Sequence, residues 1–233
     1  MRRRWVAATG LGAVLAYALG SFVTASLGAP DAPLLDGLSP PPPYRWVNPP
    51  PELESGNQAP EPGTFTLDLN RKGSTAGAFS TPDSQATVII SEGSIEAAPG
   101  ADSVALEITP LDPATLAKPP SGLELAGNAY EIVARYEPLG EPVEETTTGA
   151  DQRVVLVYPA VAGEPEHDPV TMLHSSAGGR WERLETRDSG ATQQAQVTFE
   201  SFGYFVVARP SDAGGLSSSA LGVVVLSVIL LGL

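Results

Sequence analysis

The sequence predicts an all-β fold, a single antiparallel β-sandwich, and three observations carry this prediction. Short runs alternate apolar with polar or small residues: in residues 103–109, Val104, Leu106 and Ile108 are separated by Ala and Glu, the period of two expected of a half-buried strand. Clusters of Gly, Pro, Asn and Asp separate these runs, as turns do. Between residues 64 and 209, no run has the spacing of an amphipathic helix.

The seed of the sandwich is the pair of β-rich runs at residues 86–90 and 103–109, which flank a turn region rich in Gly and Pro. About eight or nine strands are expected in all, at residues 64–69, 86–90, 103–109, 129–136, 153–158, 170–174, 180–185, 194–200 and 204–209. The segments between them, including residues 71–82 and 110–122, are expected to be loops because Gly, Pro, Ser and Thr predominate there.

Two of the expected strands carry more specific predictions. Residues 153–158 form a nearly continuous apolar run, which is typical of a central strand covered on both faces. Residues 170–174 and 180–185 bracket a short turn, so they are expected to form a hairpin with Trp181 and Leu184 pointing inward.

Both ends of the chain are expected to be membrane or targeting segments. Three arginines precede an uncharged apolar run that ends at residue 29, so residues 1–29 are expected to be a signal peptide, cleaved after Ala25, or an uncleaved signal anchor. The arginines keep the N-terminus in the cytoplasm and send the main domain outward. Residues 216–233 carry no charge, and 18 residues span roughly 27 Å as a helix, so we expect a C-terminal transmembrane segment after a linker at residues 210–215.

Residues 30–63 hold eleven prolines and are expected to form a semi-rigid stalk in the polyproline II conformation. Tyr44, Arg45 and Trp46 interrupt this stretch and are the candidate interaction residues, as a ligand for an aromatic-lined groove on a partner. The other interpretation, which the sequence favours, is that Tyr44 and Trp46 fold back and cover an edge of the sandwich, because an exposed Trp beside Val is a liability without a partner.

The domain is strongly acidic and contains no cysteine. The stretch from Pro30 to Gly215 holds all 27 acidic residues and 10 of the 13 basic ones, so it carries a formal charge of −17. Such a surface argues against binding nucleic acid or anionic lipid, which need clustered Lys and Arg. The absence of cysteine excludes disulfides and thiolate metal sites. Two Lys beside eleven Arg, with abundant Ala, Gly and Pro, are typical of a GC-rich bacterial genome.

The sequence gives no reason to expect an enzyme, a metal or a cofactor. Its two histidines are His167, which lies between two acidic residues, and His174. Two histidines without further ligands at a suitable spacing do not make a zinc site. Glu144-Glu145 lacks the alternating Asp/Asn loop that holds calcium. No Gly-x-Ser-x-Gly turn is present to carry a hydrolase serine.

Residues 86–109 resemble part of the β-sandwich domain shared by zonula occludens proteins, netrin receptors and ankyrins, and residues 197–207 look like the last hairpin of that family. Ser91 and Ser94 depart from the proline and alanine of the family pattern. Some members cut themselves at a His-Phe-Ser step in that hairpin, and the matching residues here are Ser201-Phe202-Gly203. Since the nucleophile's place is taken by glycine, the resemblance implies a structural or protein-binding role.

Together these observations predict a bacterial cell-membrane protein that holds a β-sandwich on the extracytoplasmic side, as a non-catalytic module for binding a protein or an envelope component. The alternative is a self-processing or hydrolytic surface domain with an unidentified nucleophile.

Overall fold

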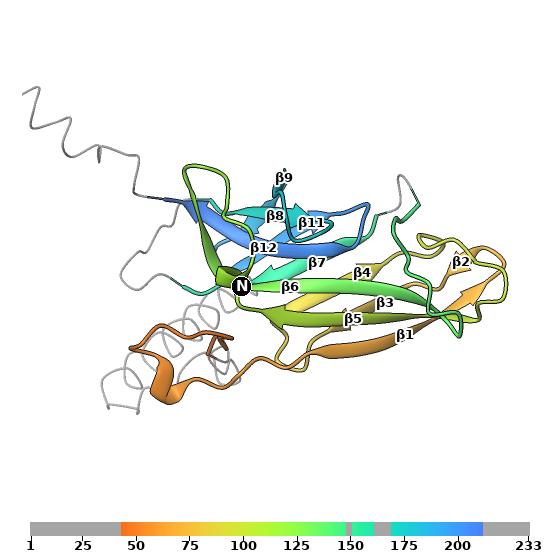
Figure 1. Cartoon of the computed structure of the whole chain (residues 1–233), viewed down its shortest axis with the longest axis horizontal. Helices are drawn as coiled ribbons and strands as arrows, with labels where there is room; N and C mark the ends of the chain where they lie inside the picture. The colour runs from red at the N-terminus through yellow and green to blue at the C-terminus, as the bar shows by residue number, and fades with distance from the viewer. Residues whose placement is uncertain (1–42, 148–150, 161–168, 212–233) are drawn as a thin grey trace, which may run out of the picture. The chain divides into compact units, whose positions relative to one another are not determined.

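The computed structural model describes residues 43–147, 151–160 and 169–211, which fold as two antiparallel β-sheets packed face to face (Figure 1). The strands in chain order are β1 (Gly63–Asn70), β2 (Gly73–Ser74), β3 (Gly77–Ser80), β4 (Ala86–Ile90), β5 (Ser103–Leu111), β6 (Leu123–Glu137), β7 (Arg153–Val157), β8 (Thr171–Ser175), β9 (Glu182–Leu184), β10 (Arg187–Ser189), β11 (Gln194–Thr198) and β12 (Gly203–Pro210). The helices of the described part are two single 3₁₀ turns, η1 (Glu54–Gly56) and η2 (Pro113–Thr115). The all-β, antiparallel prediction is therefore confirmed.

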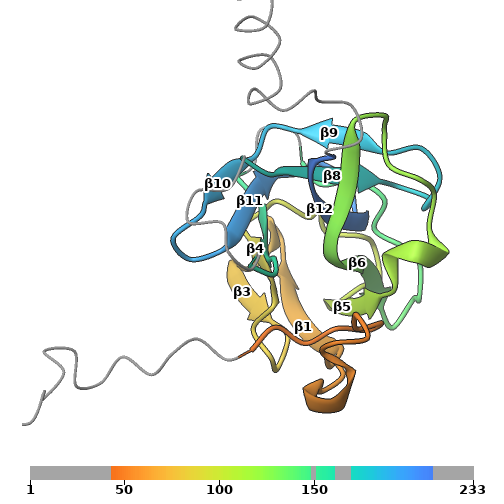
Figure 2. The same ribbon diagram turned by 90° about the vertical axis from the view of Figure 1, so that its left-hand side faces the viewer.

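One sheet has seven strands in the order β2-β1-β5-β6-β12-β8-β9, and the other has five in the order β10-β11-β7-β4-β3. Figure 2 shows the two layers from the end of the strands. The two runs expected to seed the fold, now β4 and β5, lie in different sheets. The turn region between them therefore carries the chain from one layer to the other.

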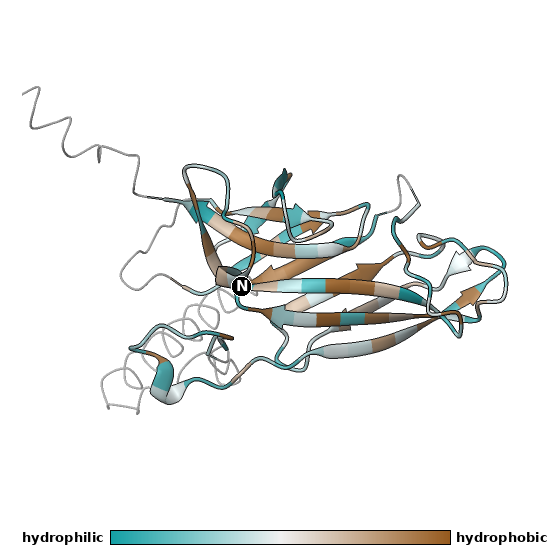
Figure 3. Cartoon of the chain, in the orientation of Figure 1, coloured by the Kyte–Doolittle hydropathy of each residue, from teal (hydrophilic) through white to brown (hydrophobic). Residues whose placement is uncertain are grey.

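The main core lies between the sheets, and buried positions alternate with less buried ones along strands such as β4, β7 and β11. Hydrophobic and hydrophilic bands follow one another along many of the strands in Figure 3. The core's largest fully buried members come from both sheets: Tyr130, Phe205, Leu106, Ile108 and Ile132 from the seven-stranded sheet, and Ile90 and Leu156 from the five-stranded one. At about 25 cal/mol per Å² of buried apolar area, this interior supplies the dominant stabilisation of a chain that has no disulfide.

A second, smaller core covers the other face of the seven-stranded sheet. Val206 and Ala208 of β12 pack there with Leu173 of β8 and Trp181, under apolar side chains of residues 111–125. The indole N–H of Trp181 donates to the carbonyl oxygen of Ala117 at 2.7 Å. The segment expected to be a long loop therefore acts as a cover, and Trp181, which is 6% exposed, is buried in this second core.

Three further details differ from the sequence prediction. Residues 71–82, expected to be a loop, hold β2 and β3, and β10 was not foreseen; all three are short strands of two to four residues. β6 begins six residues before the expected strand, because Gly127-Asn128 interrupts the alternation without ending the strand. The expected hairpin is confirmed as β8–β9. Its two apolar residues do not point the same way: Leu184 packs against the main core, whereas Trp181 lies in the second core on the other face of the sheet.

The central strand β7 is buried on one face only. Val154 and Leu156 are in the main core, whereas Arg153, Val155 and Val157 are half-buried on the outward face. The prediction that this strand is covered on both faces is therefore correct for one face only, since the outward residues are half-buried and belong to neither core of the described residues.

The predicted signal or anchor segment (residues 1–29), the C-terminal segment (residues 216–233) and residues 30–42 of the predicted stalk lie outside the described residues. Within the ranges that the structure does describe, no helix is long and apolar enough to cross a membrane.

Candidate functional site

The candidate interaction residues Tyr44, Arg45 and Trp46 lie against the sandwich. They contact Gln85, just before β4, and Asn128, within β6. Two side-chain amides hold the backbone of Arg45. Its N–H donates to Oε1 of Gln85 at 2.6 Å, and its carbonyl oxygen accepts from Nε2 of Gln85 at 3.0 Å and from Nδ2 of Asn128 at 2.7 Å. Because each amide has both a donor and an acceptor, Gln85 and Asn128 pair with this backbone as a neighbouring strand would.

A bulge in β6 places Asn128 for this task. Val206 of β12 pairs with Ala129 of β6, while the next residue of β12, Val207, pairs with Ala126. Gly127 and Asn128 are therefore extra residues in β6, as in a β-bulge. Gly127 has φ +86°, and a Cβ built on it would lie 2.4 Å from the Tyr44 hydroxyl oxygen. Only glycine allows Tyr44 to approach the backbone here.

The tyrosine hydroxyls belong to the same buried network. The backbone N–H of Asn128 donates to the hydroxyl oxygen of Tyr44 at 2.7 Å, and Nε2 of Gln85 donates to the hydroxyl oxygen of Tyr130 at 3.2 Å. Burial raises the pKa of Tyr44 well above its usual value and raises the pKa of Tyr130 to about 12. Both hydroxyls are therefore neutral at physiological pH, and their protons are available for hydrogen bonds.

Trp46 and Val47 extend the contact. The N–H of Trp46 donates to Oδ1 of Asn57 and its carbonyl accepts from Nδ2 of the same side chain, both at 2.9 Å. The N–H of Val47 donates to Oδ1 of Asn128 at 2.9 Å. The indole of Trp46 meets the Tyr44 ring edge-on, with 4.9 Å between ring centroids. We call residues 44–47, with Gln85 and Asn128, the N-terminal clamp.

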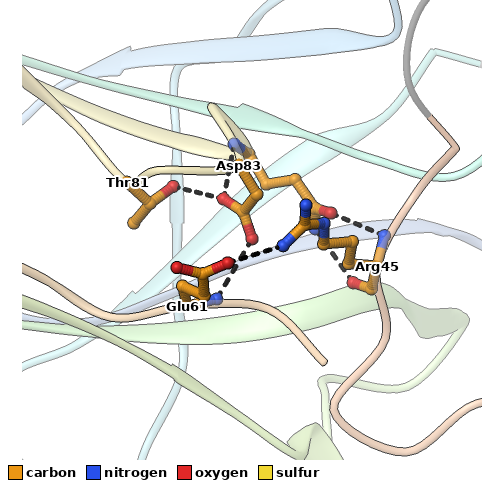
Figure 4. Close-up of polar contacts among 5 residues, drawn as sticks. Arg45, Glu61, Thr81 and Asp83 are labelled. Carbon is orange, nitrogen blue, oxygen red and sulfur yellow. Dashed lines mark hydrogen bonds and ion pairs between the residues drawn. The ribbon is translucent and has the colours of Figure 1, made fainter. Parts of the chain in front are cut away.

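The side chain of Arg45 joins a chain of polar contacts outside the clamp (Figure 4). Its guanidinium donates to Oε1 of Glu61 at 2.9 Å, the N–H of Glu61 donates to Oδ2 of Asp83 at 3.3 Å, and the Thr81 hydroxyl donates to Oδ1 of Asp83 at 2.6 Å. These contacts tie residues 45 and 61 to the connection between β3 and β4. Residues 44–62, predicted as part of a stalk, thus bind to the domain, at the end of the strands rather than along an edge strand.

The chain leaves the domain beside the place where it enters. The N–H of Ser211 donates to the carbonyl oxygen of Gly122 at 3.1 Å, just before β6. Trp46 and Arg209 line one cavity of about 150 Å³, together with Gly127 and Pro159. Entry and exit of the described domain therefore lie at the same end of the sandwich, and Tyr44, Arg45 and Trp46 are at this end.

A second candidate site is an open cleft of about 720 Å³ at the opposite side of the sheets, where His174 faces the ends of β7 and β11. Its walls carry mixed charge from Asp151, Arg153, Glu182, Glu185, Arg187 and Glu200. Nε2 of His174 lies 3.4 Å from the carbonyl oxygen of Phe202, and the imidazole packs 4.7 Å from the Phe205 ring, centroid to centroid. Burial lowers the pKa of His174, so the ring is neutral at physiological pH.

This cleft contains Ser201, the first residue of the Ser201-Phe202-Gly203 step. The structure brings His174 to this step from β8, which sequence reasoning missed because the two are distant in the chain. Gly203 has φ +137°, and a Cβ built there would lie 2.6 Å from the carbonyl oxygen of Ser175. The backbone therefore has no space at position 203 for a nucleophilic side chain.

The remaining candidate metal ligands named from the sequence are Glu144, Glu145 and His167. Glu144 and Glu145 are exposed, and His167 lies outside the described residues. Among residues 43–147, 151–160 and 169–211, no group of three or more His, Cys, Asp or Glu side chains is arranged to hold a metal ion.

We compared the chain with protein families and with curated proteins. No protein-family model matches the chain, and no curated protein matches it. The resemblance to the zonula occludens, netrin-receptor and ankyrin domain stays a prediction.

Proposed function

We propose that this chain is an exported, membrane-anchored protein whose extracytoplasmic β-sandwich is a non-catalytic module that binds a protein or an envelope component. The observation that carries the proposal is the common end at which the chain enters and leaves the domain, at the clamp and at Ser211. Segments before and after the domain can reach one membrane from this end without crossing the sandwich, so the opposite end faces away.

The clamp supports a mechanical part of this role. The backbone of Arg45 and Val47 makes four hydrogen bonds with the side chains of Gln85 and Asn128, which fix residues 45–47 to the domain. Arg45 and Trp46 keep half-exposed side chains, so they are the predicted contacts for a partner close to the membrane.

The test is alkaline carbonate extraction of membranes from a bacterium expressing the full chain, followed by intact-mass measurement. We expect the protein in the carbonate-resistant fraction, either whole or shortened by its first 25 to 29 residues, while a soluble periplasmic marker is released. Recovery of the protein with that marker would contradict membrane anchoring.

The alternative function, a self-processing or hydrolytic surface domain, is favoured by one observation: His174 and Ser201 share a cleft beside the Phe202 carbonyl. The same mass measurement separates the two functions. An internal cut near residues 201–203 that disappears in His174→Gln would establish self-processing, whereas an uncut domain leaves the non-catalytic role. The lack of space at Gly203 is the reason we favour the latter.

A further inference from the structure

Residues 44–62, which we call the docked segment, lie against the sandwich without joining either hydrophobic core. The rings of Tyr44 and Trp46 are half-buried, none of the segment's residues is fully buried, and neither core of the described residues includes one of them. Val47 and Leu53 are 38% and 50% exposed. Burial of apolar surface is the dominant stabilising term in a folded domain. The docked segment therefore lies outside the part of the molecule that this term holds together.

Hydrogen bonds to two side chains hold the first part of the docked segment. Four join the backbone of Arg45 and Val47 to Gln85 and Asn128, and the Tyr44 hydroxyl oxygen accepts a fifth from the Asn128 N–H. When the segment lifts, water takes the place of each partner, so the net free energy lost with each bond is much smaller than the strength of the bond itself. These bonds fix the position of the segment and still allow it to leave.

The contacts of the second part of the segment are on the surface. Nδ2 of Asn48 donates to Oδ2 of Asp112 at 3.1 Å, and the N–H of Glu61 donates to Oδ2 of Asp83 at 3.3 Å. The guanidinium of Arg45 donates to Oε1 of Glu61 at 2.9 Å and closes the segment on itself. Exposed contacts of this kind contribute little to stability, so the second part follows once the first part opens.

The surface that receives the segment is held in place by the sandwich. The Gln85 N–H and the Thr81 hydroxyl both donate to Oδ1 of Asp83, at 3.1 and 2.6 Å, and Nε2 of Gln85 donates to the Tyr130 hydroxyl at 3.2 Å. The pairing of β6 with β12 continues on both sides of the bulge that contains Asn128. None of these bonds involves residues 44–62, so the receiving surface stays formed when the segment leaves it.

The charges of the segment and of the domain also favour opening. The docked segment holds three acidic residues and one basic one, a formal charge of −2, and residues 63–215 hold 22 acidic and nine basic ones, a formal charge of −13. The domain side chains that accept from Asn48 and Glu61 are themselves aspartates. Because like charges repel, the hydrogen bonds of the clamp hold the segment against an unfavourable electrostatic background.

We propose that the docked segment opens and closes as a unit on an intact sandwich, and that it thereby changes the length of the N-terminal tether. Its 19 residues include five prolines, and at about 3.1 Å per residue, the rise of a proline-rich chain, the open segment spans roughly 60 Å. The composition that predicted a stalk over residues 30–63 fits the open form, and the contacts of the clamp define the closed form. The role as a tether rests on the proposed function, whereas the opening itself does not.

Native-state hydrogen exchange of the purified full chain in non-ionic detergent, measured for single amides, tests the opening. The N–H groups of Arg45, Trp46 and Val47 all donate to side chains, so each exchanges only after its bond breaks. We expect these amides to exchange at least about a hundredfold faster than those of Val154 and Leu156 in β7, and more slowly than an unstructured peptide. Exchange at the rate of β7 would mean that the segment leaves only when the sandwich unfolds, and exchange at the unprotected rate would mean that it is not docked. Either result would overturn the proposal.

Asn57→Ala tests whether the segment acts as a unit. The Asn57 amide binds both backbone groups of Trp46, at 2.9 Å each, from within the segment. Its loss should speed exchange at Arg45 and Val47 about tenfold and leave the exchange of β7 unchanged. The matched control is Gln58→Ala at the next, exposed position, which should change neither. Unaltered exchange at Arg45 and Val47 in Asn57→Ala would contradict a cooperative opening.

The exchange measurement does not depend on membrane anchoring, because it is made in detergent. A protein that carbonate releases from membranes, but whose docked segment exchanges faster than β7, would refute the anchor and support the opening. A membrane-bound protein whose docked segment exchanges together with β7 would refute the opening and leave the membrane proposal intact.

Discussion

At the scale of single residues, Gly127 joins the N-terminal clamp to the sandwich. Its positive φ and the absence of a side chain are separate requirements, since one concerns the backbone and the other the space taken by the Tyr44 hydroxyl. Two other glycines separate these requirements. Gly122 has φ +79° with no atom within 4 Å of a built Cβ, and Gly179 has neither constraint.

We therefore predict a graded result for three substitutions by alanine. Gly179→Ala should leave the free energy of unfolding nearly unchanged, and Gly122→Ala should lower it by about 1 kcal/mol through backbone strain. Gly127→Ala adds a clash with Tyr44 and should cost about 2 to 4 kcal/mol in total. Chemical denaturation measures all three, and equal losses at Gly122 and Gly127 would mean that Tyr44 does not dock there.

The buried hydroxyl of Tyr130 makes stability depend on alkaline pH. Its pKa is about 12 in the folded protein, against about 10 in an unfolded chain. Because the folded pKa is the higher one, this contribution is complete below pH 10 and is lost as the pH rises from 10 to 12. The loss is about 2 to 3 kcal/mol for this group. Unfolding curves from pH 8 to 12 should show the decrease, and Tyr130→Phe should make it smaller; an equally steep decrease in the variant would exclude Tyr130.

At the scale of structural elements, the cover formed by residues 111–125 depends on Trp181. The indole fills the space between this segment and β8, and its N–H satisfies the carbonyl of Ala117. Trp181→Ala removes both the apolar area and the hydrogen bond, so we predict a loss of about 3 to 5 kcal/mol in unfolding free energy and a substantially lower melting temperature. Trp181→Phe, which loses the hydrogen bond but keeps a ring, should cost less. An unchanged melting curve for Trp181→Ala would remove Trp181 from the core.

The elements differ in how far the sequence predicts them. Strands such as β5 and β11 alternate clearly because one face is in the core, and β3 and β10 are too short for a period of two to be recognisable. The sequence favours the interpretation in which Tyr44 and Trp46 fold back onto the domain, but it places them on an edge of the sandwich and does not indicate what holds them. Its anchors Gln85 and Asn128 are ordinary polar residues in the sequence, and only the bulge at Gly127 brings them to Arg45. Contacts between residues 40 to 83 positions apart have no local signal.

At the scale of the whole molecule, charge balance matters more than any single ion pair. Ten basic residues face 27 acidic ones between Pro30 and Gly215, so most carboxylates have no cation to pair with. Within the described part of the chain, Arg45 pairs with Glu61, Arg153 with Asp151 and Arg209 with Glu124, and all three ion pairs are partly exposed. Exposed pairs of this kind contribute about 0 to 1 kcal/mol each. Repulsion among the carboxylates therefore outweighs attraction, and it opposes the compact state.

This imbalance predicts that salt stabilises the protein. Raising NaCl from about 10 mM to about 1 M shortens the screening length from about 30 Å to about 3 Å. Screening weakens repulsion across the whole domain more than it weakens three local pairs, so the melting temperature of the full chain in non-ionic detergent should rise by a few degrees. An uncharged osmolyte at equal osmolality controls for general solvent effects, and a melting temperature that falls with salt would show that attraction dominates.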